Sequence, residues 1–477
     1  MTPPPRFSVH FETLGCRLNQ TESENMAKAF FDAGFSPDRE AAGSADVPLC
    51  VVNTCTVTGK AEQKARRLIR LLLSKFPRAC VLVTGCYAEL DGGALAAMNK
   101  RIAVLPFSRQ GALPRIAETL RGFLADGADG EAAAAFLAQV LSALCTEDGA
   151  PDDRFRLETS TFFAHSRPSL KIQDGCDRAC SYCRVRLARG SPVSLDAALA
   201  LERVRRLEVD GHREVTLTGA NLSLYRSPYR GAALDLARLL GLLLERTSAI
   251  SIRLSSLHPD TVGEAFCAVA RGERVRPHFH LSVQSLSDSV LRGMNRPYRA
   301  AAVLEAVARL RAAKDAPFLA CDIIAGFPGE TDADFAETLA RLRECNFAWI
   351  HAFPFSPRPG TPAAALKQVP SAVKAERARA LQNLAVASKC AYIAAFAGWE
   401  TSAIIERPAS CGRTGGAALR GVTANFIHVE IANPRGEALA GGSEAAVRIL
   451  SPLPDRIARG GECEALAELT FGRAERT

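Results

Sequence analysis

Short apolar runs alternate with amphipathic stretches over the first 120 residues. Residues 47–55 and 79–86 are almost continuously apolar and contain several valines, as strands buried on both faces do. Between them, residues 60–76 (KAEQKARRLIRLLLSKF) repeat their apolar positions with a helical period. This alternation predicts an α/β fold that begins with a doubly wound parallel-sheet domain over residues 7–120.

The same alternation returns between residues 161 and 395. Apolar runs predict strands at 214–220, 251–256, 278–285, 318–327 and 348–356. Amphipathic helices are predicted between them at 198–210, 235–247, 301–314 and 334–346. A repeated β/α unit of this length predicts a second domain that is a partial (β/α) barrel.

Two further segments lack this alternation. Residues 121–160 include the Gly/Ala/Asp-rich stretch DGADGEAAAA, and we expect a linker or insertion with some helix. From residue 396 to 455, short strands are separated by Gly-rich turns, which predicts a small C-terminal antiparallel β-barrel. Residues 456–477 are expected to form a tail.

Composition supports a globular, cytoplasmic protein. Hydrophobic residues make up 48% of the 477 residues and charged residues 23%, which suffices for a buried core. The first twelve residues show no secretory signal, and the longest apolar stretch, 132–146, is too short to span a membrane. In a reducing compartment, clustered cysteines are more often metal ligands than disulfides. The net charge of +8 permits a polyanionic partner such as RNA.

Three of the fifteen cysteines lie within eight residues, as Cys176, Cys180 and Cys183. A structural zinc site needs four ligands, usually from paired C-x2-C hooks, and no second hook lies nearby. Three thiolates on a four-iron cubane would instead leave one iron open to a small molecule. Tyr182, directly before the last cysteine, is a candidate to pack on an aromatic cofactor. A zinc site with a distant fourth ligand is the alternative.

Three upstream cysteines each follow a predicted strand. They are Cys16, Cys55 and Cys86. The carboxyl ends of parallel strands meet at one edge of a sheet, so these thiols could form a second three-ligand site. The alternative is that they are ordinary buried cysteines, as Cys50 and Cys80 are expected to be.

The motifs together resemble a known family. C-x3-C-x2-C with an aromatic residue before its third cysteine resembles the radical S-adenosylmethionine (SAM) superfamily. TLGCRLNQTES (13–23), NTCTV (53–57), TGCYAE (84–89) and VLRGMNRPY (290–298) extend the resemblance to the methylthiotransferases along almost the whole chain. The resemblance implies SAM and two [4Fe–4S] clusters. Cys176, Cys180 and Cys183 would hold the radical-generating cluster, and Cys16, Cys55 and Cys86 an auxiliary one.

The resemblance also implies further cofactor-binding residues at or just beyond the barrel strands. With Tyr182, they are Gly219, Asn221, Arg253, Ser255, Gln284, Asp322 and Glu330. Arg189 is expected to pair with the cofactor carboxylate or with a phosphate. Two departures from the family pattern, Arg184-Val185-Arg186 and Leu286, are expected to affect substrate fit more than cluster binding, Leu286 through the shape of the pocket. They leave open an altered target or a reduced activity.

The motifs TLGCRLNQTES and KIQDGC (171–176) are similar to those of the branch that modifies threonylcarbamoyladenosine in tRNA. This implies methylthiolation at carbon 2 of the nucleoside at position 37. The implied partners are the tRNA anticodon loop and an electron donor such as flavodoxin or ferredoxin. Residues 400–452 resemble the TRAM RNA-binding barrel, most closely at 421–431, and Lys60, Lys64 and Arg67 could face tRNA phosphates. The alternatives are isopentenyladenosine tRNA, a ribosomal-protein aspartate, or a non-catalytic zinc- and RNA-binding protein.

Overall fold

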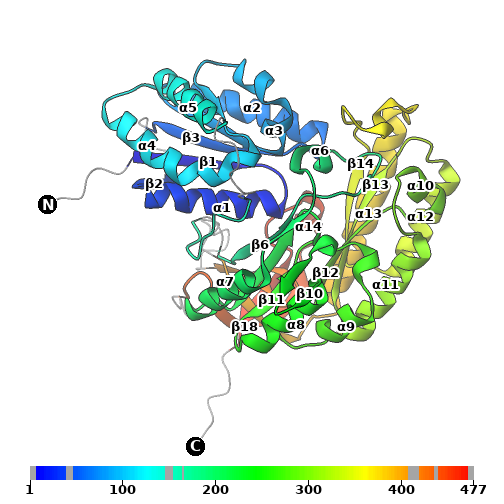
Figure 1. Ribbon diagram of the computed structural model, residues 1–477. Helices are drawn as coiled ribbons and strands as arrows, with labels where there is room; N and C mark the ends of the chain where they lie inside the picture. The colour runs from blue at the N-terminus through cyan, green and yellow to red at the C-terminus, as the bar shows by residue number, and fades with distance from the viewer. Residues whose placement is uncertain are drawn as a thin grey trace, which may run out of the picture.

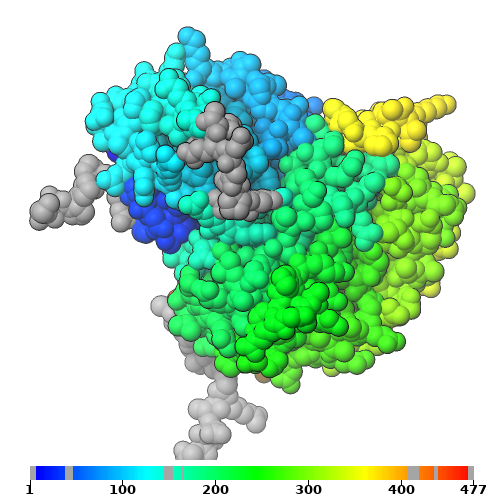
Figure 2. Space-filling view, viewed as in Figure 1, coloured from blue at the N-terminus to red at the C-terminus, as the bar shows by residue number. Residues whose placement is uncertain are grey.

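The computed structural model describes residues 7–38, 47–145, 154–163, 166–406, 418–433 and 439–470. Figure 1 shows an N-terminal layer in blue and cyan beside a larger central part in green and yellow. The space-filling view in Figure 2 shows that these two parts meet along a continuous surface. The predicted α/β fold class is confirmed.

The N-terminal layer is a five-stranded parallel sheet in the order β2-β1-β3-β4-β5. Its strands are β1 (Phe7–Thr13), β2 (Phe35–Asp38), β3 (Leu49–Thr54), β4 (Cys80–Gly85) and β5 (Ile102–Val104). Its helices are α1 (Arg17–Asp32), α2 (Gly59–Lys75), α3 (Cys86–Ala96), α4 (Leu113–Ala125) and α5 (Gly130–Cys145). Separate apolar cores lie on the two faces of this sheet, so the sheet is doubly wound, as predicted.

Helix α5 lies where the sequence predicted a linker. It contacts β4, β5 and α4, and Ala133, Ala134, Leu137 and Leu141 are buried in the core they share. The small alanine side chains let the helix approach the sheet closely. A segment rich in alanine and glycine can be either such a helix or a linker, so its composition alone did not distinguish the two. This segment is therefore part of the N-terminal layer.

The central part contains two sheets. The first has the order β11-β8-β6-β7 and the second β12-β13-β14, and all pairs except β6–β7 are parallel. The strands are β6 (Ser169–Asp174), β7 (Val193–Ser194), β8 (Glu214–Gly219), β11 (Ser251–Leu254), β12 (His278–Gln284), β13 (Phe318–Ala325) and β14 (Trp349–Pro354). Single bridges at Ile252–Val275 and Leu257–Leu281 connect the sheets. The result is a partial barrel of six parallel strands.

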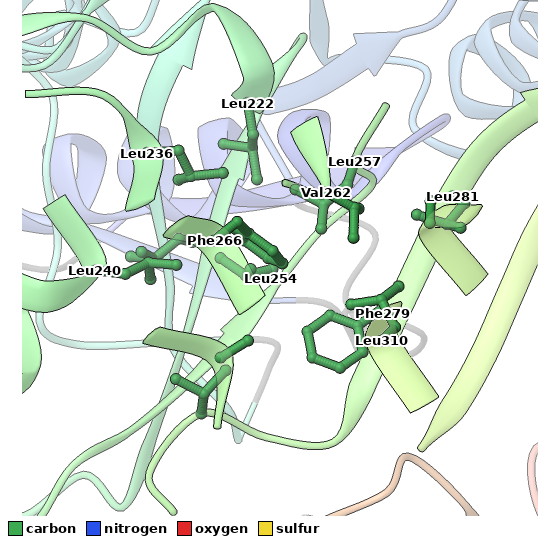
Figure 3. Packing of buried hydrophobic residues seen from close by; sticks show 14 of the residues in the cluster. Leu222, Leu236, Leu240, Leu254, Leu257, Val262, Phe266, Phe279, Leu281 and Leu310 are labelled. Atoms are coloured by element: carbon green, nitrogen blue, oxygen red, sulfur yellow. The ribbon is translucent and has the colours of Figure 1, made fainter. Parts of the chain in front are cut away.

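Helices cover the outside of this barrel. They are α7 (Ala197–Val209), α8 (Leu236–Arg246), α9 (Glu264–Ala270), α10 (Asp288–Gly293), α11 (Ala300–Ala313), α12 (Asp332–Cys345) and α13 (Ser371–Ala394). The short helix α6 (Val185–Arg189) instead contacts α3 of the N-terminal layer. A small hairpin joins β9 (Ser227–Tyr229) to β10 (Ala232–Leu234). Figure 3 shows Leu240 and Phe266 of the helices lying over Leu254 and Phe279 of the strands. Burial of each such side chain stabilises the fold by about 1.5–3 kcal/mol.

The C-terminal part is a closed barrel in the order β15-β16-β17-β19-β18. Its elements are β15 (Glu400–Ile405), β16 (Ala418–Thr423), β17 (His428–Ala432), β18 (Glu444–Pro452), α14 (Pro454–Arg459) and β19 (Ala465–Leu469). The expectation of a tail from residue 456 is wrong, because β19 pairs with both β17 and β18 and closes the barrel. The β17–β19 pair is parallel, unlike the other pairs of this barrel. Within the described residues, no helix is long and apolar enough to cross a bilayer.

Candidate active site

The three clustered cysteines lie on the loop that follows β6. Cys176, Cys180 and Cys183 line a cavity of about 810 Å³ that runs along the inside of the partial barrel. Gly175, just before the first of these cysteines, has a φ of 72° and begins the loop. The carboxyl ends of the strands in such a barrel are where active-site groups gather.

Each of these three sulfur atoms has a hydrogen-bond donor. Arg296 Nη1 lies 3.3 Å from Cys180 Sγ, and Asn221 Nδ2 lies 3.7 Å from Cys176 Sγ. The backbone N–H of Val185 donates to Cys183 Sγ over 3.4 Å. Donors to sulfur stabilise the thiolate form and set the reduction potential of an iron–sulfur centre.

The upstream cysteines gather at the edge of the N-terminal sheet. Cys16 follows β1, Cys55 follows β3 and Cys86 follows β4, and these three strands are neighbours in the sheet. Cys55 and Cys86 are buried, whereas Cys16 is exposed and lines the same cavity as the loop cysteines. The structure therefore brings one thiol of the upstream set and all three loop cysteines to the wall of one cavity.

The upstream sulfurs have the same three kinds of partner. Arg189 Nε donates to Cys86 Sγ over 3.1 Å, and the backbone N–H of Val57 donates to Cys55 Sγ over 3.5 Å. The Cys16 thiol donates to the side-chain oxygen of Asn19 over 3.7 Å, whereas Asn221 donates to Cys176. Each set thus has one arginine and one backbone N–H, placed two residues after a cysteine, as donors to sulfur.

The donor chemistry of both sets fits an iron–sulfur cluster. Within the described residues, no three Cys, His, Asp or Glu side chains lie close enough to bind a single metal ion. A cubane presents its irons at separate corners, so its thiolates stand further apart than the ligands of one zinc ion. Burial raises the pKa of Cys55 to about 11 and that of Cys86 and Cys183 to about 12. These thiols are therefore protonated at neutral pH, and they become ligands only when a bound metal displaces the proton.

Arg189 does not lie in the cavity, so the expectation that it pairs with a cofactor carboxylate or a phosphate is wrong. It is buried between the two domains and pairs with Glu22 at 2.8 Å and Asp174 at 3.0 Å. Lys171 bridges the same two carboxylates at 3.2 and 3.0 Å. Burial alone would raise the pKa of Asp174, but Lys171 and Arg189 lower it to about 2. The network ties α1 to β6 and fixes one set of thiols relative to the other.

The two departures from the family pattern reach the cavity wall only in part, because Val185 and Arg186 line it and Arg184 and Leu286 do not. Arg184 turns away from it and pairs with Glu62 at 3.2 Å, and Arg358 contacts the same carboxylate. Leu286 is fully buried in the barrel core and is absent from the cavity lining. Arg184 therefore contributes to the domain interface and Leu286 to packing.

The other predicted site residues divide into two groups. The members that line the cavity are Tyr182, Asn221, Arg253, Ser255, Gln284 and Asp322. A β-bulge at the end of β12 gives Gln284 a φ of 70° and turns its side chain towards the cavity.

Gly219 and Glu330 are not among the lining residues of the cavity. Gly219 packs against Gln173. The Glu330 carboxylate accepts hydrogen bonds from the Gly326 N–H at 2.6 Å and from Arg377 at 2.7 Å. Glu330 thereby fastens the loop after β13 to α13, which is a structural role.

Sequence reasoning missed several polar residues of the site. Asn19 and Glu22 were part of the motif TLGCRLNQTES but had no assigned role, and Arg296 lay unassigned in VLRGMNRPY. Five histidines also line the cavity, namely His258, His278, His280, His351 and His428. The sequence of α1 could have indicated some of these residues. A helix with polar residues on all faces must bury some of them, and those need partners.

Gly85 fixes the position of Cys86, and we expect its replacement to be costly. It has a φ of 94°, and a Cβ there would lie 2.3 Å from the Thr54 carbonyl oxygen. Gly85→Ala should lower the free energy of unfolding by about 1–3 kcal/mol. It should also remove about half of the bound iron, because Cys86 shifts. Thermal melting and iron analysis measure both effects.

Gly93→Ala is the matched control for this change. Gly93 lies in the following helix, α3, and a Cβ there meets no atom within 4 Å. This variant should melt at the wild-type temperature or slightly above it. If Gly85→Ala and Gly93→Ala behaved alike, Gly85 would have no role in placing Cys86.

Comparisons with known proteins agree with this geometry. Residues 170–342 match the Radical SAM superfamily and residues 8–105 match Uncharacterized protein family UPF0004. The chain is 42% identical over 486 residues to the threonylcarbamoyladenosine tRNA methylthiotransferase MtaB of Treponema pallidum (strain Nichols), covering 93% of this chain and 98% of the relative. The MtaB of Thermotoga maritima is 34% identical over 384 residues, covering 79% and 82%. The Kitasatospora setae radical SAM methyltransferase TsrM has a TM-score of 0.49 and 14% identity, covering 76% and 77%.

A loop with three cysteines after the first strand of a partial β/α barrel, together with the superfamily match, defines a radical SAM enzyme, a class that uses a [4Fe–4S] cluster and SAM. The chain belongs to the threonylcarbamoyladenosine tRNA methylthiotransferase family, as the identity over most of its length shows.

Proposed function

We propose that this protein adds a methylthio group to carbon 2 of N6-threonylcarbamoyladenosine at position 37 of tRNA. The names of the Treponema and Thermotoga relatives support this substrate. The observation that carries the proposal is that Cys16 and the three loop cysteines line one cavity. A nucleoside in this cavity can therefore contact Cys16 of the upstream set and the three loop cysteines without leaving it.

Two [4Fe–4S] clusters are part of the proposal. Cys176, Cys180 and Cys183 would hold the cluster that works with SAM, and Cys16, Cys55 and Cys86 the auxiliary cluster. When bound, these groups supply the one-electron chemistry that replaces hydrogen on an unactivated carbon, which no general base removes at neutral pH. Each set offers three thiols, so one corner of each cluster stays open.

The chain's own residues hold and orient these groups. Arg296 links Cys180 to Tyr298, and its Nη1 lies 3.5 Å from the Tyr182 hydroxyl. The Tyr182 ring packs near Val290, Met294, Phe327 and Phe355, so the cysteine loop rests on a rigid apolar support. Asn221 fixes Cys176, and Ser255, Gln284 and Asp322 present polar atoms to a nucleoside and to SAM.

Four histidines in the wall act as neutral hydrogen-bonding groups, because burial lowers the pKa of His258, His278, His351 and His428. The pKa falls to about 4 for His351 and to about 3 for His258. Asp322 lies 3.1 Å from His280, which holds the pKa of this buried carboxyl below its usual range. At neutral pH these four histidines can therefore contact a base without a change of protonation.

We propose that the tRNA backbone binds at the mouth of this cavity. Val57 and Thr58 line the mouth, and α2 begins at the next residue. Five basic residues are exposed along this helix, namely Lys60, Lys64, Arg67, Arg70 and Lys75. They could contact phosphates while the loop base at position 37 is turned into the cavity. An electron donor such as flavodoxin or ferredoxin completes the proposed set of partners.

Deletion of the gene tests the function. Nucleoside mass spectrometry of tRNA should show that the methylthio-threonylcarbamoyladenosine peak is lost and that the unmethylthiolated nucleoside accumulates. Loss of methylthio-isopentenyladenosine, or of the methylthio mass on a ribosomal-protein aspartate, would instead identify another target. An unchanged nucleoside profile would reject tRNA as the substrate.

Iron analysis tests the two-cluster assignment. Protein purified without oxygen should contain about eight irons and acid-labile sulfide per chain. Replacing Cys16, Cys55 and Cys86 by alanine together should leave about four. The matched control replaces Cys50 and Cys80, which are buried in strands away from the cavity, and should retain about eight. Zinc without labile sulfide would support the non-catalytic alternative.

A further inference from the structure

The cavity carries an excess of positive charge. Among the residues that the structure describes, its lining includes six cationic side chains but only two carboxylates, those of Asp322 and Glu464. The cations are Arg17, Arg178, Arg186, Arg253, Arg296 and Lys389. Both carboxylates already have partners, because Asp322 faces His280 and Glu464 binds Lys389. A substrate with an anionic group would therefore be favoured over a neutral one.

Arg17 differs from most of these cations because it has no partner. Arg178 pairs with Asp260 at 3.1 Å, and Arg253 pairs with Glu214 at 2.7 Å. Arg296 donates to Cys180 and to a backbone carbonyl. The guanidinium of Arg17 makes no hydrogen bond or ion pair with any residue that the structure describes, although it is half-buried.

The surroundings of Arg17 make this lack of a partner unfavourable. The positively charged side chains of Arg167 and Arg253 lie close enough to act on its guanidinium. The carboxylates in this region are already bound: Glu214 by three arginines and Glu406 by Arg167 and Arg420. A buried cation without a counterion is costly, and an anion placed beside it would remove that cost.

Unpaired polar atoms of neighbouring residues point to a ligand at the same place. Arg253 is 1% exposed and its Nη1 has no hydrogen-bond partner among the described residues. Ser255 Oγ and His278 Nδ1 are also buried without a partner in that part of the chain, and all three residues line the cavity. Such buried atoms usually have a partner, so several along one cavity wall indicate a polar ligand.

We propose that Arg17 binds the carboxylate of the threonyl group on the substrate nucleoside. This inference rests on the proposed function and assigns the residue that distinguishes threonylcarbamoyladenosine from a nucleoside with a neutral side chain. Arg17 directly follows Cys16, so a carboxylate bound there would hold the purine between the two thiol sets. The planar guanidinium can donate two parallel hydrogen bonds to a carboxylate.

A binding experiment with two synthetic anticodon stem-loops tests this assignment. One carries threonylcarbamoyladenosine at position 37, and the other carries its carboxamide, which has nearly the same shape and no charge. Affinities are measured by fluorescence anisotropy with the cluster-loaded enzyme under nitrogen. Wild-type protein should bind the carboxylate form about 10- to 100-fold more tightly, as expected for a hydrogen bond to a charged group.

Variants at position 17 locate the effect. Arg17→Gln should lose this preference, because only its affinity for the stem-loop with the carboxylate should fall. Arg17→Lys should recover part of the preference. Arg186→Gln is the matched control, because Arg186 is an exposed cation that lines the cavity. Any loss in that variant should be equal for the two oligonucleotides.

The outcomes separate this inference from the proposed function. Equal binding of the two stem-loops by wild-type protein, or equal weakening of both by Arg17→Gln, overturns the role of Arg17. A preference that depends on Arg17 supports it, whatever turnover shows. Absence of the methylthio product with such a preference intact would reject the proposed reaction and leave the carboxylate site standing. Weaker SAM binding by Arg17→Gln, with both stem-loops bound equally, would assign Arg17 to the carboxylate of SAM.

Discussion

Cys183→Ala should abolish methylthiolation and the reductive cleavage of SAM together. Cys183 is one of three thiols in its set, and its sulfur accepts a hydrogen bond from the Val185 N–H within a buried turn. Two remaining thiols cannot anchor a cubane at three corners, so the initiating electron is not delivered. We expect turnover to fall at least about a thousandfold, which corresponds to about 4 kcal/mol of barrier. Mass spectrometry of the nucleoside and of 5′-deoxyadenosine measures both losses.

Cys390→Ala is the control for this loss. Cys390 lies on α13, is partly buried and is absent from the cavity lining. It should retain most of the wild-type activity and the full iron content. The assignment of the loop cysteines would fail if Cys183→Ala kept more than a tenth of wild-type turnover while Cys390→Ala kept all of it.

The predicted site came from cysteines that follow predicted strands. Cys16, Cys55 and Cys86 are far apart in the chain, yet the alternation of strand and helix implied that they share one sheet edge, and the structure places them there. Strand ends are predictable because a parallel sheet aligns them all in one direction. No knowledge of side-chain contacts was needed for this step.

The partners of those cysteines could not be predicted in the same way. Strand β6, with the sequence SLKIQD, was missed because Lys171, Gln173 and Asp174 make it look like an exposed loop. All three are buried. Glu22 balances the charge of Lys171 and Arg189 that of Asp174, and both partners lie elsewhere in the chain. Such charges are buried because tertiary contacts pair them. The local pattern of polar residues therefore predicts wrongly that they are exposed.

The C-terminal barrel shows the same limit at a domain boundary. Its strand β19 was assigned to a tail, because the short segment ALAEL has no strong strand pattern. Phe426, in the β16–β17 turn, lines the cavity, and its ring is tilted by 34° against that of His278 of the central barrel, with the ring centroids 4.0 Å apart. The resemblance to an RNA-binding barrel indicated a surface role and did not reveal that this barrel also forms one wall of the cavity.

Glu214→Gln should separate this C-terminal barrel from the central one. The fully buried Glu214 carboxylate binds Arg253 at 2.7 Å, Arg276 at 2.9 Å and Arg167 at 3.7 Å. Arg276 also binds Glu444 and Arg167 binds Glu406, both in the C-terminal barrel. Removing the central charge leaves three buried arginines without their shared partner, which should cost about 3–5 kcal/mol. Hydrogen exchange should then accelerate in β15, β16 and β18.

The pH dependence of this effect follows from the pKa of Glu214. Burial alone would raise that pKa, but the three arginines lower it from 4.5 to about 2. A carboxylate with a lowered pKa contributes its stabilisation fully above 4.5 and loses it only as the pH falls towards 2. The difference between Glu214→Gln and wild type should therefore be constant from pH 5 to pH 9. A difference that faded within this range would mean that Glu214 is not the charge that holds the barrels together. Glu202→Gln, which removes an exposed ion pair with Arg206, should change stability by less than about 1 kcal/mol and leave the exchange of the C-terminal strands unaltered.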